Sequence, residues 1–542
     1  TDTTLDDTEL EELAKARTAA TITTWLTTRL APGAPPTAPT AEPGSDTVAG
    51  EAPKRFVLRP VPLPGTRQDP ASVLAGKRFV LLGGDEDDGE GDGVAAQLAA
   101  KLAAHGAETL VAAADHRLTG ADGTADGVLY LGALAAGTAA PVLPDAFGVF
   151  RAALARTPGR LLALRPAGDV GSAGLHGLFR TIAREYPQTA ASVVDLADGT
   201  APADALLDEL LAAGTAPVVV RAASGRHALE MTETPLGTLG STGAGPAGDG
   251  AAEAAALGLD RDSVVVLVGG ARGITAKFAA ALAAASRCRI ELLGRTPAPT
   301  GPENADTAAA RTPAELRAVL AARSGGALKP AEVNRAAGLL LAQREIADTL
   351  AELTALGSEV RYRSVDFRDQ DAALQAVKEI HAEHGRLDGV VYAAGVIEDR
   401  LIAEKTDESF QRVYGTKTGG AATLFAALDE LPAGPSFAVL FGSVSAVLGN
   451  RGQADYAAAN DALESLGADW AVRTGHRALT VHWGPWAPTG GHTGMVSPEL
   501  GREYARRGIR LIDPEEGTAA LLRELAWGDD SVRAVVYTSS GW

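Results

Sequence analysis

The chain contains the same pattern twice: an apolar run that ends in two glycines, followed later by an apolar run that begins with Asp-Gly. Residues 79–84 have the sequence FVLLGG and residues 126–130 have DGVLY, whereas residues 264–270 have VVVLVGG and residues 388–392 have DGVVY. Ala- and Leu-rich stretches typical of helices separate the runs in both halves. Buried strands that alternate with helices indicate βαβ units. The sequence therefore predicts an α/β fold with two related, doubly wound, mostly parallel sheets.

Changes in composition suggest where these units begin and end. Residues 31–54 are rich in Pro and Ala, and a Gly-rich break follows residue 234. Such segments are typical of linkers. We expect a helix over residues 1–30, a linker over 31–54, a Rossmann-like subdomain over 55–234, a second linker over 235–258, and a second Rossmann-like subdomain over 259–542.

Composition and charge exclude several functions. The 542 residues carry 49 Lys and Arg against 68 Asp and Glu, a net charge of −19, which excludes general binding to a nucleic-acid backbone. Cys288 is the single cysteine, so an internal disulfide framework and a thiolate zinc site are excluded. No apolar run reaches the ~18 residues that span a bilayer. The acidic N-terminus lacks a Met and is no signal peptide. We expect a cytoplasmic domain excised from a longer polypeptide.

The two halves differ at the turn where a cofactor would bind. In the first half, residues 85–92 carry six carboxylates, which would repel a pyrophosphate at a turn that normally attracts anions. We therefore expect the first subdomain to be structural and free of cofactor. In the second half, residues 268–275 have the sequence VGGARGIT and precede an Ala-rich helix. Gly269 and Gly273 allow a tight turn and a close approach to phosphate, as in a dinucleotide-binding loop.

An arginine follows the next predicted strand, where NAD-specific sites place a carboxylate. Arg295 can pair with the 2′-phosphate of NADPH, and Arg272 adds a second positive charge; the alternative is that Arg295 is only a solvated residue at the end of a strand. We therefore favour NADPH as cofactor. The residues expected to bind it are Gly269, Gly270, Arg272, Gly273, Ile274, Arg295, Asp366, Phe367, Ala393, Ala394 and Gly395.

Four residues further along the chain suit the reduction of a ketone, which needs donors for the developing alkoxide and a proton for its oxygen. Ser443 can hydrogen-bond to the carbonyl, and Tyr456 can deliver the proton. Lys417 can lower the pKa of Tyr456 from its reference value of about 10. Asn460 shares a helix face with Tyr456 and could position Lys417 through a water or a backbone carbonyl. Each residue alone has a purely structural interpretation, but the set after a cofactor loop favours an active site.

The motifs of the second half form a recognisable set: the Gly-rich loop, Gly294-Arg295, Tyr392-Ala393-Ala394-Gly395, Lys417, Ser443, Tyr456-x-x-x-Asn460 and Trp483-Gly484-Pro485-Trp486. This set resembles the ketoreductase domain of type I polyketide synthases, a short-chain dehydrogenase/reductase with a structural subdomain ahead of the catalytic one. The resemblance covers roughly residues 55–540. It implies NADPH-dependent reduction of a β-ketoacyl thioester on an acyl carrier protein, with Lys417, Ser443, Tyr456 and Asn460 as the catalytic tetrad.

The resemblance also predicts the stereochemical outcome. B-type domains of this family resemble Leu-Asp-Asp after the Ala-Ala-Gly turn, and here Ile397-Glu398-Asp399 occupies that position. A-type domains have a Trp eight residues before the catalytic Tyr, where this chain has Leu448. We therefore expect B-type reduction to the D-configured (3R) alcohol, although Glu398 and Asp399 could also be simple solvated acids. The residues expected to contact substrate are Asp399, Leu448, Trp483 and Met495.

Two segments of the second half, 297–345 and 491–510, each allow two interpretations. Residues 297–345, with a predicted helix over 314–324, resemble an insertion in ketoreductases of iterative and polyunsaturated fatty acid synthases, or form a plain surface insertion. Residues 491–510 have glycines at the start, a helical middle and several arginines. They suit a lid and a docking surface for an acidic carrier protein, or a solvated helix face.

No set of residues has metal-ligand spacing, so no metal is expected. Two alternatives to a carrier-dependent reductase stay open. One is a non-reducing scaffold or docking domain that keeps the fold. The other is a free-standing reductase of small ketones, against which the cofactor-free first subdomain argues.

Overall fold

The computed structural model describes residues 50–84, 93–135, 140–197, 199–237, 244–245, 248–299, 301–488, 496 and 498–540. These residues all belong to one compact unit that spans residues 48–542. The predicted N-terminal helix, nearly all of the first linker, the acidic turn 85–92 and Met495 lie outside the described residues. Within the described parts of the chain, no helix combines the length and apolar character that crossing a bilayer requires.

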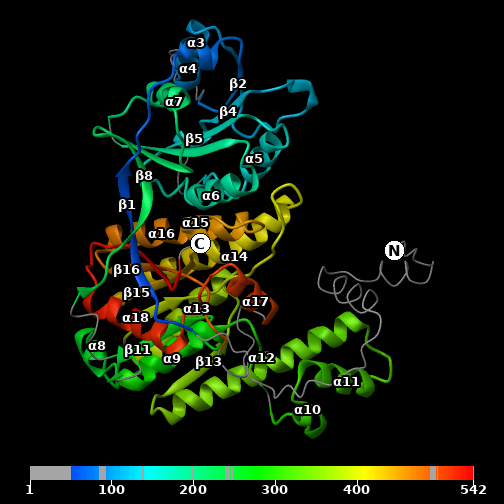
Figure 1. The fold of residues 1–542 in the computed structure, drawn as a ribbon. Coiled ribbons are helices and arrows are strands. Elements are labelled where there is room, and N and C mark those ends of the chain that lie inside the picture. The colour runs from blue at the N-terminus through cyan, green and yellow to red at the C-terminus, as the bar shows by residue number, and fades with distance from the viewer. Residues whose placement is uncertain are drawn as a thin grey trace, which may run out of the picture. The chain divides into compact units, whose positions relative to one another are not determined.

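The N-terminal half runs from β1 to β8 (Figure 1). Its elements are β1 (Lys54–Pro62), α3 (Pro70–Leu74), β2 (Arg78–Leu82), α4 (Val94–Ala104), β3 (Glu108–Ala112), two short 3-10 helices (Gly120–Asp122 and Gly132–Leu134), β4 (Gly127–Tyr130), α5 (Phe147–Leu154), β5 (Arg160–Pro166), α6 (Leu175–Glu185), β6 (Ala190–Leu196), α7 (Pro202–Leu211), β7 (Val218–Ala222) and β8 (Gly225–Glu233).

The C-terminal half runs from α8 to β17, after a short pairing of β9 (Ala244–Gly245) with β10 (Gly248–Asp249). Its elements are α8 (Ala251–Ala256), β11 (Val264–Val268), α9 (Gly273–Ser286), β12 (Arg289–Gly294), α10 (Ala305–Ala309), α11 (Pro313–Arg323), α12 (Pro330–Ala355), β13 (Val360–Ser364), α13 (Gln370–His384), β14 (Gly389–Tyr392), α14 (Asp407–Asp429), β15 (Phe437–Ser443), α15 (Ser445–Leu448), α16 (Ala454–Thr474), β16 (Arg477–Trp483), α17 (Pro498–Arg506), α18 (Pro514–Trp527) and β17 (Ala534–Thr538).

Two parallel sheets with the same strand order confirm the predicted fold class. The order is β3-β2-β4-β5-β6-β7 in the N-terminal half and β12-β11-β14-β15-β16-β17 in the C-terminal half, which adds β13 at its edge. The repeated sequence runs form neighbouring strands in each half, β2 beside β4 and β11 beside β14. The equivalent aspartates make equivalent hydrogen bonds: Asp126 accepts from the N–H of Arg78 (3.0 Å), and Asp388 accepts from that of Val264 (2.8 Å).

The two halves are joined into a single 15-stranded sheet through β1, which pairs antiparallel with β17 on one side and β8 on the other. Figure 1 shows β1 running from one half to the other, with α6 packed over α15 and α16. The approach is close because Gly177 of α6 has no side chain: a Cβ there would lie 2.2 Å from the carbonyl oxygen of Ala457 in α16. The core is shared as well, since Phe147 stacks on Phe410 at 4.2 Å.

Two predicted boundaries differ from the structure. The segment 235–258, predicted as a linker, contains α8, whose Ala254 is buried and which packs against α9 and α18 of the C-terminal half. The predicted helix over 314–324 matches α11, but the predicted insertion 297–345 does not end at a break in structure. It continues into α12, which runs to Ala355 and is the crossover helix between the parallel strands β12 and β13.

The additional helices are anchored to α12 by one arginine. Arg344 forms a bidentate ion pair with Glu303 (2.9 and 2.8 Å) and donates to the carbonyl oxygens of Thr307 and Ala310 at the end of α10. Figure 1 shows α12 projecting from the C-terminal half with α10 and α11 along its outer part. The insertion is therefore an extension of a regular crossover helix rather than a separate domain.

Candidate active site

Most of the predicted site residues line one cleft of about 1000 Å³. The cleft lies at the carboxyl ends of the parallel strands of the C-terminal half, where α/β proteins bind their ligands. It is lined from one end to the other by the Gly-rich loop after β11, the turns after β12 and β14, and residues of α14, β15, α16 and α17. Cofactor-loop and catalytic candidates, which are far apart in the sequence, therefore share one cavity.

The glycines of the cofactor loop have different roles. Gly269 and Gly273 have positive φ angles of 80° and 58°, and both line the cleft. A Cβ at Gly273 would meet no atom within 4 Å, so this position at the start of α9 is open to a phosphate. Gly270 does not line the cleft as predicted: it is buried, and a Cβ there would lie 2.5 Å from that of Leu267. Its role is close packing of the turn against the core.

The two predicted phosphate-binding arginines both line the cleft and are exposed. Arg272 lies 3.6 Å from Glu345 of α12, so the extended crossover helix contacts the cofactor loop. In the described part of the chain, no carboxylate lies within 4 Å of the Arg295 guanidinium. Asp366 also lines the cleft, but its carboxylate pairs with Arg368 (3.0 and 2.5 Å), which lowers its pKa.

The remaining cofactor candidates line the same cleft as these arginines. Ile274, Ala393, Ala394 and Gly395 line the cleft. Phe367 also lines it, although its side chain is 5% exposed and packs edge-on against Tyr392. Small residues after β14 therefore leave room beside the loop, as the sequence predicts.

Three members of the predicted tetrad surround one point of the cleft. Tyr456 lies in the first turn of α16, Ser443 ends β15, and Lys417 lies in α14. The Lys417 ammonium lies 5.7 Å from the centre of the Tyr456 ring and 3.5 Å from the carbonyl oxygen of Ala394. All three line the cleft.

Asn460 is buried behind Tyr456, one turn further along α16, and does not line the cleft. Its Nδ2 donates to the backbone carbonyl of Tyr456 (2.7 Å), and its Oδ1 is buried with no hydrogen-bond partner among the described residues. Among the described residues Asn460 makes no direct hydrogen bond to Lys417, and the link through a water or a backbone carbonyl stays a prediction. The unpaired Oδ1 leaves one acceptor, which a water between Asn460 and Lys417 would satisfy.

The pKa of Tyr456 moves in the direction opposite to the one expected from the sequence. Burial raises the pKa of this phenol, and polar contacts with Asn460 and Ser443 only partly oppose that effect. Burial also lowers the pKa of Lys417 to about 8. Tyr456 is therefore a neutral phenol that can donate a proton, and the lysine is still mostly charged at neutral pH.

Three of the predicted substrate residues also line the cleft, and the part of the cleft that they line is called its substrate end. Asp399, Leu448 and Trp483 line it, and Trp483 packs edge-on against Trp486 at 4.9 Å. Glu398 is no solvated acid: Arg412 binds it bidentately (2.6 and 2.6 Å) and lowers its pKa to about 2. The ion pair with Arg412 of α14 thus holds the loop that carries Asp399 in place.

Sequence reasoning missed several residues of this region. Gln453 lines the cleft and donates to Asp399 (3.1 Å), and its position three residues before Tyr456 is the signal that could have revealed it. Lys405 and Asp455 form a fully buried ion pair at 2.7 Å directly beside Tyr456. No local pattern marks that pair, because Lys405 precedes α14 whereas Asp455 lies in the first turn of α16, 50 residues further along the chain.

The predicted lid is described only in part, from residue 498 onward and at Val496. Leu500 and Tyr504 of α17 line the cleft and pack with Val496 against Ala487 and Leu511. The predicted basic residues are exposed, but Arg510 pairs with Glu51 at 2.7 Å. Arg502, Arg506 and Arg507 are also exposed on or just after α17, and Arg507 lies 3.9 Å from Glu503.

One group of potential metal ligands lies elsewhere in the C-terminal half. Glu291, Glu383 and His384 come within reach of one ion. Arg363, however, already pairs with Glu291 (3.0 Å) and Glu383 (2.8 Å). This arginine neutralises both carboxylates without a metal ion, and we assign this group as an ion-pair network.

The fold and the cleft are those of an α/β protein with a Rossmann-like sheet, and comparisons with known proteins show what part of the chain resembles. Residues 263–488 match the KR domain family. One subunit of the polyunsaturated fatty acid synthase of Thraustochytrium sp. is 33% identical over 287 residues, which cover 51% of this chain and 10% of that protein. Polyketide synthase GfsE of Streptomyces halstedii is 38% identical over 194 residues, 35% of this chain and 5% of that protein. The chain therefore spans a tenth or less of the length of these relatives.

Solved ketoreductases share the fold over nearly the whole chain. The ketoreductase PlmKR1 from the first module of phoslactomycin biosynthesis in Streptomyces sp. HK803 has a TM-score of 0.63 at 22% identity and covers 91% of this chain and 94% of its own. An A1-type ketoreductase has a TM-score of 0.64 at 23% identity, with 90% and 93% coverage. Residues 263–488 thus match a KR domain, and the relatives named here are polyketide and polyunsaturated fatty acid synthases, which confirms the resemblance seen in the sequence.

Proposed function

We propose that the chain reduces a β-ketoacyl thioester, carried on an acyl carrier protein, to the D-configured β-hydroxyacyl thioester with NADPH. The observation that carries this proposal is the shared cleft: Tyr456, Ser443 and Lys417 line the same cavity as the open glycine loop and Arg295. A carbonyl placed beside Tyr456 would therefore lie next to a nicotinamide bound along that loop.

The residues present fit a dinucleotide. The open Gly273 and the N-terminal N–H groups of α9 would hold the pyrophosphate. Arg295 and Arg272 would pair with the 2′-phosphate, the group that distinguishes NADPH from NADH. When bound, NADPH supplies the hydride that adds to the carbonyl carbon.

The protein's own groups manage the charge on the carbonyl oxygen. Ser443 donates a hydrogen bond to that oxygen and orients the ketone. Tyr456, kept neutral by burial, transfers its phenolic proton to the oxygen as negative charge develops there. The charge left on the phenolate is stabilised by the Lys417 ammonium nearby.

The stereochemical part of the proposal rests on the substrate end of the cleft. Asp399 is held there by Gln453, and Leu448 takes the place of the Trp that A-type domains carry. The carrier part rests on charge. Arg502, Arg506 and Arg507 are exposed on or just after α17 beside the cleft, where an acidic carrier protein would deliver its thioester.

The proposal is tested by measuring NADPH oxidation with a panel of β-ketoacyl thioesters, free and carrier-bound, for the wild type and Tyr456→Phe. Loss of the phenolic proton should lower kcat by about 10²- to 10⁴-fold while NADPH still binds. Tyr414→Phe is the matched control, because Tyr414 is a buried tyrosine outside the cleft that donates to Ala173.

The outcomes separate the alternatives. NADPH binding without turnover on any thioester would support the scaffold instead, and equal activity of Tyr456→Phe and wild type would refute the assigned acid. Chiral analysis of the product checks the stereochemistry, and a predominantly L-configured alcohol contradicts the B-type assignment.

A further inference from the structure

Helix α6 of the N-terminal half reaches across the junction with polar side chains that bind the backbone of the C-terminal half. Arg180 donates to the carbonyl oxygen of residue 446 (2.7 Å), and Arg184 donates to that of residue 448 (2.6 Å). The Thr181 hydroxyl accepts from the N–H of residue 450 (3.3 Å). Three side chains on two turns of one helix thus hold residues 446 and 448 of α15 and residue 450 in the segment that follows α15.

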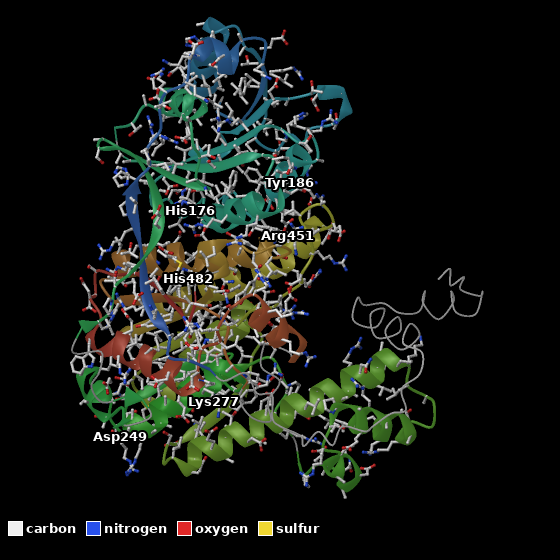
Figure 2. The ribbon with its side chains drawn as sticks, viewed as in Figure 1. His176, Tyr186, Asp249, Lys277, Arg451 and His482 are labelled. Carbon is white, nitrogen blue, oxygen red and sulfur yellow. The ribbon has the colours of Figure 1, made fainter. Side chains whose placement is uncertain are left out.

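Glu185, the last residue of α6, makes the most specific of these contacts. One carboxylate oxygen accepts from the N–H of Gly452 (2.7 Å), and the other accepts from the N–H of Ile402 (2.8 Å). These two amides belong to different loops, one before α16 and one after β14. In Figure 2, Tyr186 and Arg451, the chain neighbours of Glu185 and Gly452, face each other across the junction.

The two loops that Glu185 joins are those that form the substrate end of the cleft. The loop after β14 carries Asp399, and the loop before α16 carries Gln453, which donates to Asp399 across the gap. A further hydrogen bond links the loops, from the N–H of Arg400 to the carbonyl oxygen of Gly452 (2.9 Å). The carboxylate of Glu185 therefore acts together with this bond, the Gln453–Asp399 bond and the buried Lys405–Asp455 pair to hold the two loops at a fixed separation.

We propose that Glu185 is a positioning residue of the reductase, which fixes the width of the substrate end of the cleft from the N-terminal half. The inference rests on the proposed function, since it assigns Glu185 to the binding of the same thioester. It makes the N-terminal half part of substrate selection, because Glu185 supplies both acceptor oxygens from outside the half that performs the chemistry.

A carboxylate suits this task for a chemical reason. Both of its oxygens accept hydrogen bonds, so one side chain can hold two N–H donors at once. Glutamine has nearly the same size but only one acceptor oxygen, and its NH₂ group would face the second N–H donor. Glu185→Gln therefore releases one loop with little change in volume.

The experiment compares wild type, Glu185→Gln and a matched control in the thioester assay. The control is Asp204→Asn, which removes a carboxylate of the same half from an exposed pair with Lys101 at the surface. We expect Glu185→Gln to raise KM for the thioester by roughly tenfold and to lower the fraction of D-alcohol. The Kd for NADPH and the kinetics of Asp204→Asn should stay within about twofold of wild type.

Hydrogen–deuterium exchange provides a readout that does not depend on turnover. Peptides that contain Ile402 and Gly452 should exchange at least about tenfold faster in Glu185→Gln, with no such change in Asp204→Asn. If the wild type reduces no thioester, the proposed function fails while the exchange rates still decide whether Glu185 holds the loops. Unchanged exchange, or a lower melting temperature with unchanged KM and product ratio, would show that Glu185 only joins the two halves.

Discussion

Replacing Lys405 by methionine should destabilise the protein by about 3–5 kcal/mol at pH 8. Both side chains of the Lys405–Asp455 pair are buried, with 0% and 1% exposure, and the ammonium lies 2.7 Å from the carboxylate. Lys405 also donates to the carbonyl oxygen of Glu398 (2.6 Å), and Asp455 accepts from the N–H of Tyr456 (2.8 Å). Methionine fills the space but leaves the Asp455 charge buried and unpaired, which is the costly outcome for a buried pair.

The cost should depend on pH with a definite sign. Burial raises the pKa of Asp455 to about 6, although Lys405 opposes the rise, while the value in an unfolded chain is about 3.9. Between those values the folded state binds more protons than the unfolded state, so this carboxyl contributes less stability as the pH rises. Loss of the Lys405 charge raises the pKa of Asp455 further. The deficit of the variant should therefore be larger at pH 8 than at pH 5.

Urea unfolding, followed by tryptophan fluorescence at both pH values, measures this deficit. Lys378→Met is the control, because the pair of Lys378 with Glu430 is 41% and 50% exposed and should contribute less than about 1 kcal/mol. The double variant Lys405→Met/Asp455→Asn removes the unpaired charge and should recover part of the loss. A deficit below about 1 kcal/mol at pH 8, or one that is equal at both pH values, would refute the reasoning.

Two further predictions concern catalysis and the cofactor. Burial lowers the pKa of Lys417 to about 8, so kcat/KM for a thioester should fall above about pH 8 as the ammonium loses its proton. Lys417→Arg should move that fall to higher pH. A fall at the same pH in both enzymes would contradict this role of Lys417. Arg295→Ala should weaken NADPH binding by roughly 10- to 100-fold and leave NADH binding nearly unchanged. Fluorescence titration with both cofactors measures this, and an equal loss for the two would show that Arg295 does not contact the 2′-phosphate.

The sequence was informative where a function depends on neighbours in the chain. The strands, the glycine loop and the spacing of Ser443, Tyr456 and Asn460 are local patterns, and they led to the right fold and to one cleft. The prediction that Gly270 contacts the cofactor is wrong, because the pattern alone does not tell which glycine faces the core. The extent of the insertion was misjudged because α12 continues through its expected end without a break.

Contacts between distant segments could not be predicted in this way. Glu185 binds amides that are 217 and 267 residues further along the chain, and Lys405 pairs with a carboxylate 50 residues away. The pKa of Tyr456 was misjudged for the same reason. The nearby lysine is visible in the sequence, but the burial that outweighs it arises only when α14, α16 and the sheet pack together.

These contacts show what the N-terminal half contributes to the proposed active site. Tyr456 lies in the first turn of α16. Helix α6 covers one side of α16 so closely that a methyl group at Gly177 would collide with the backbone of Ala457. Phe410 of α14, the helix that carries Lys417, stacks on Phe147 of the N-terminal half. The acid and its lysine thus lie on helices whose outer faces are buried by the N-terminal half. The N-terminal half therefore holds both helices in place, and a substitution in its α6 is expected to change the cleft without altering the residues proposed to perform the chemistry.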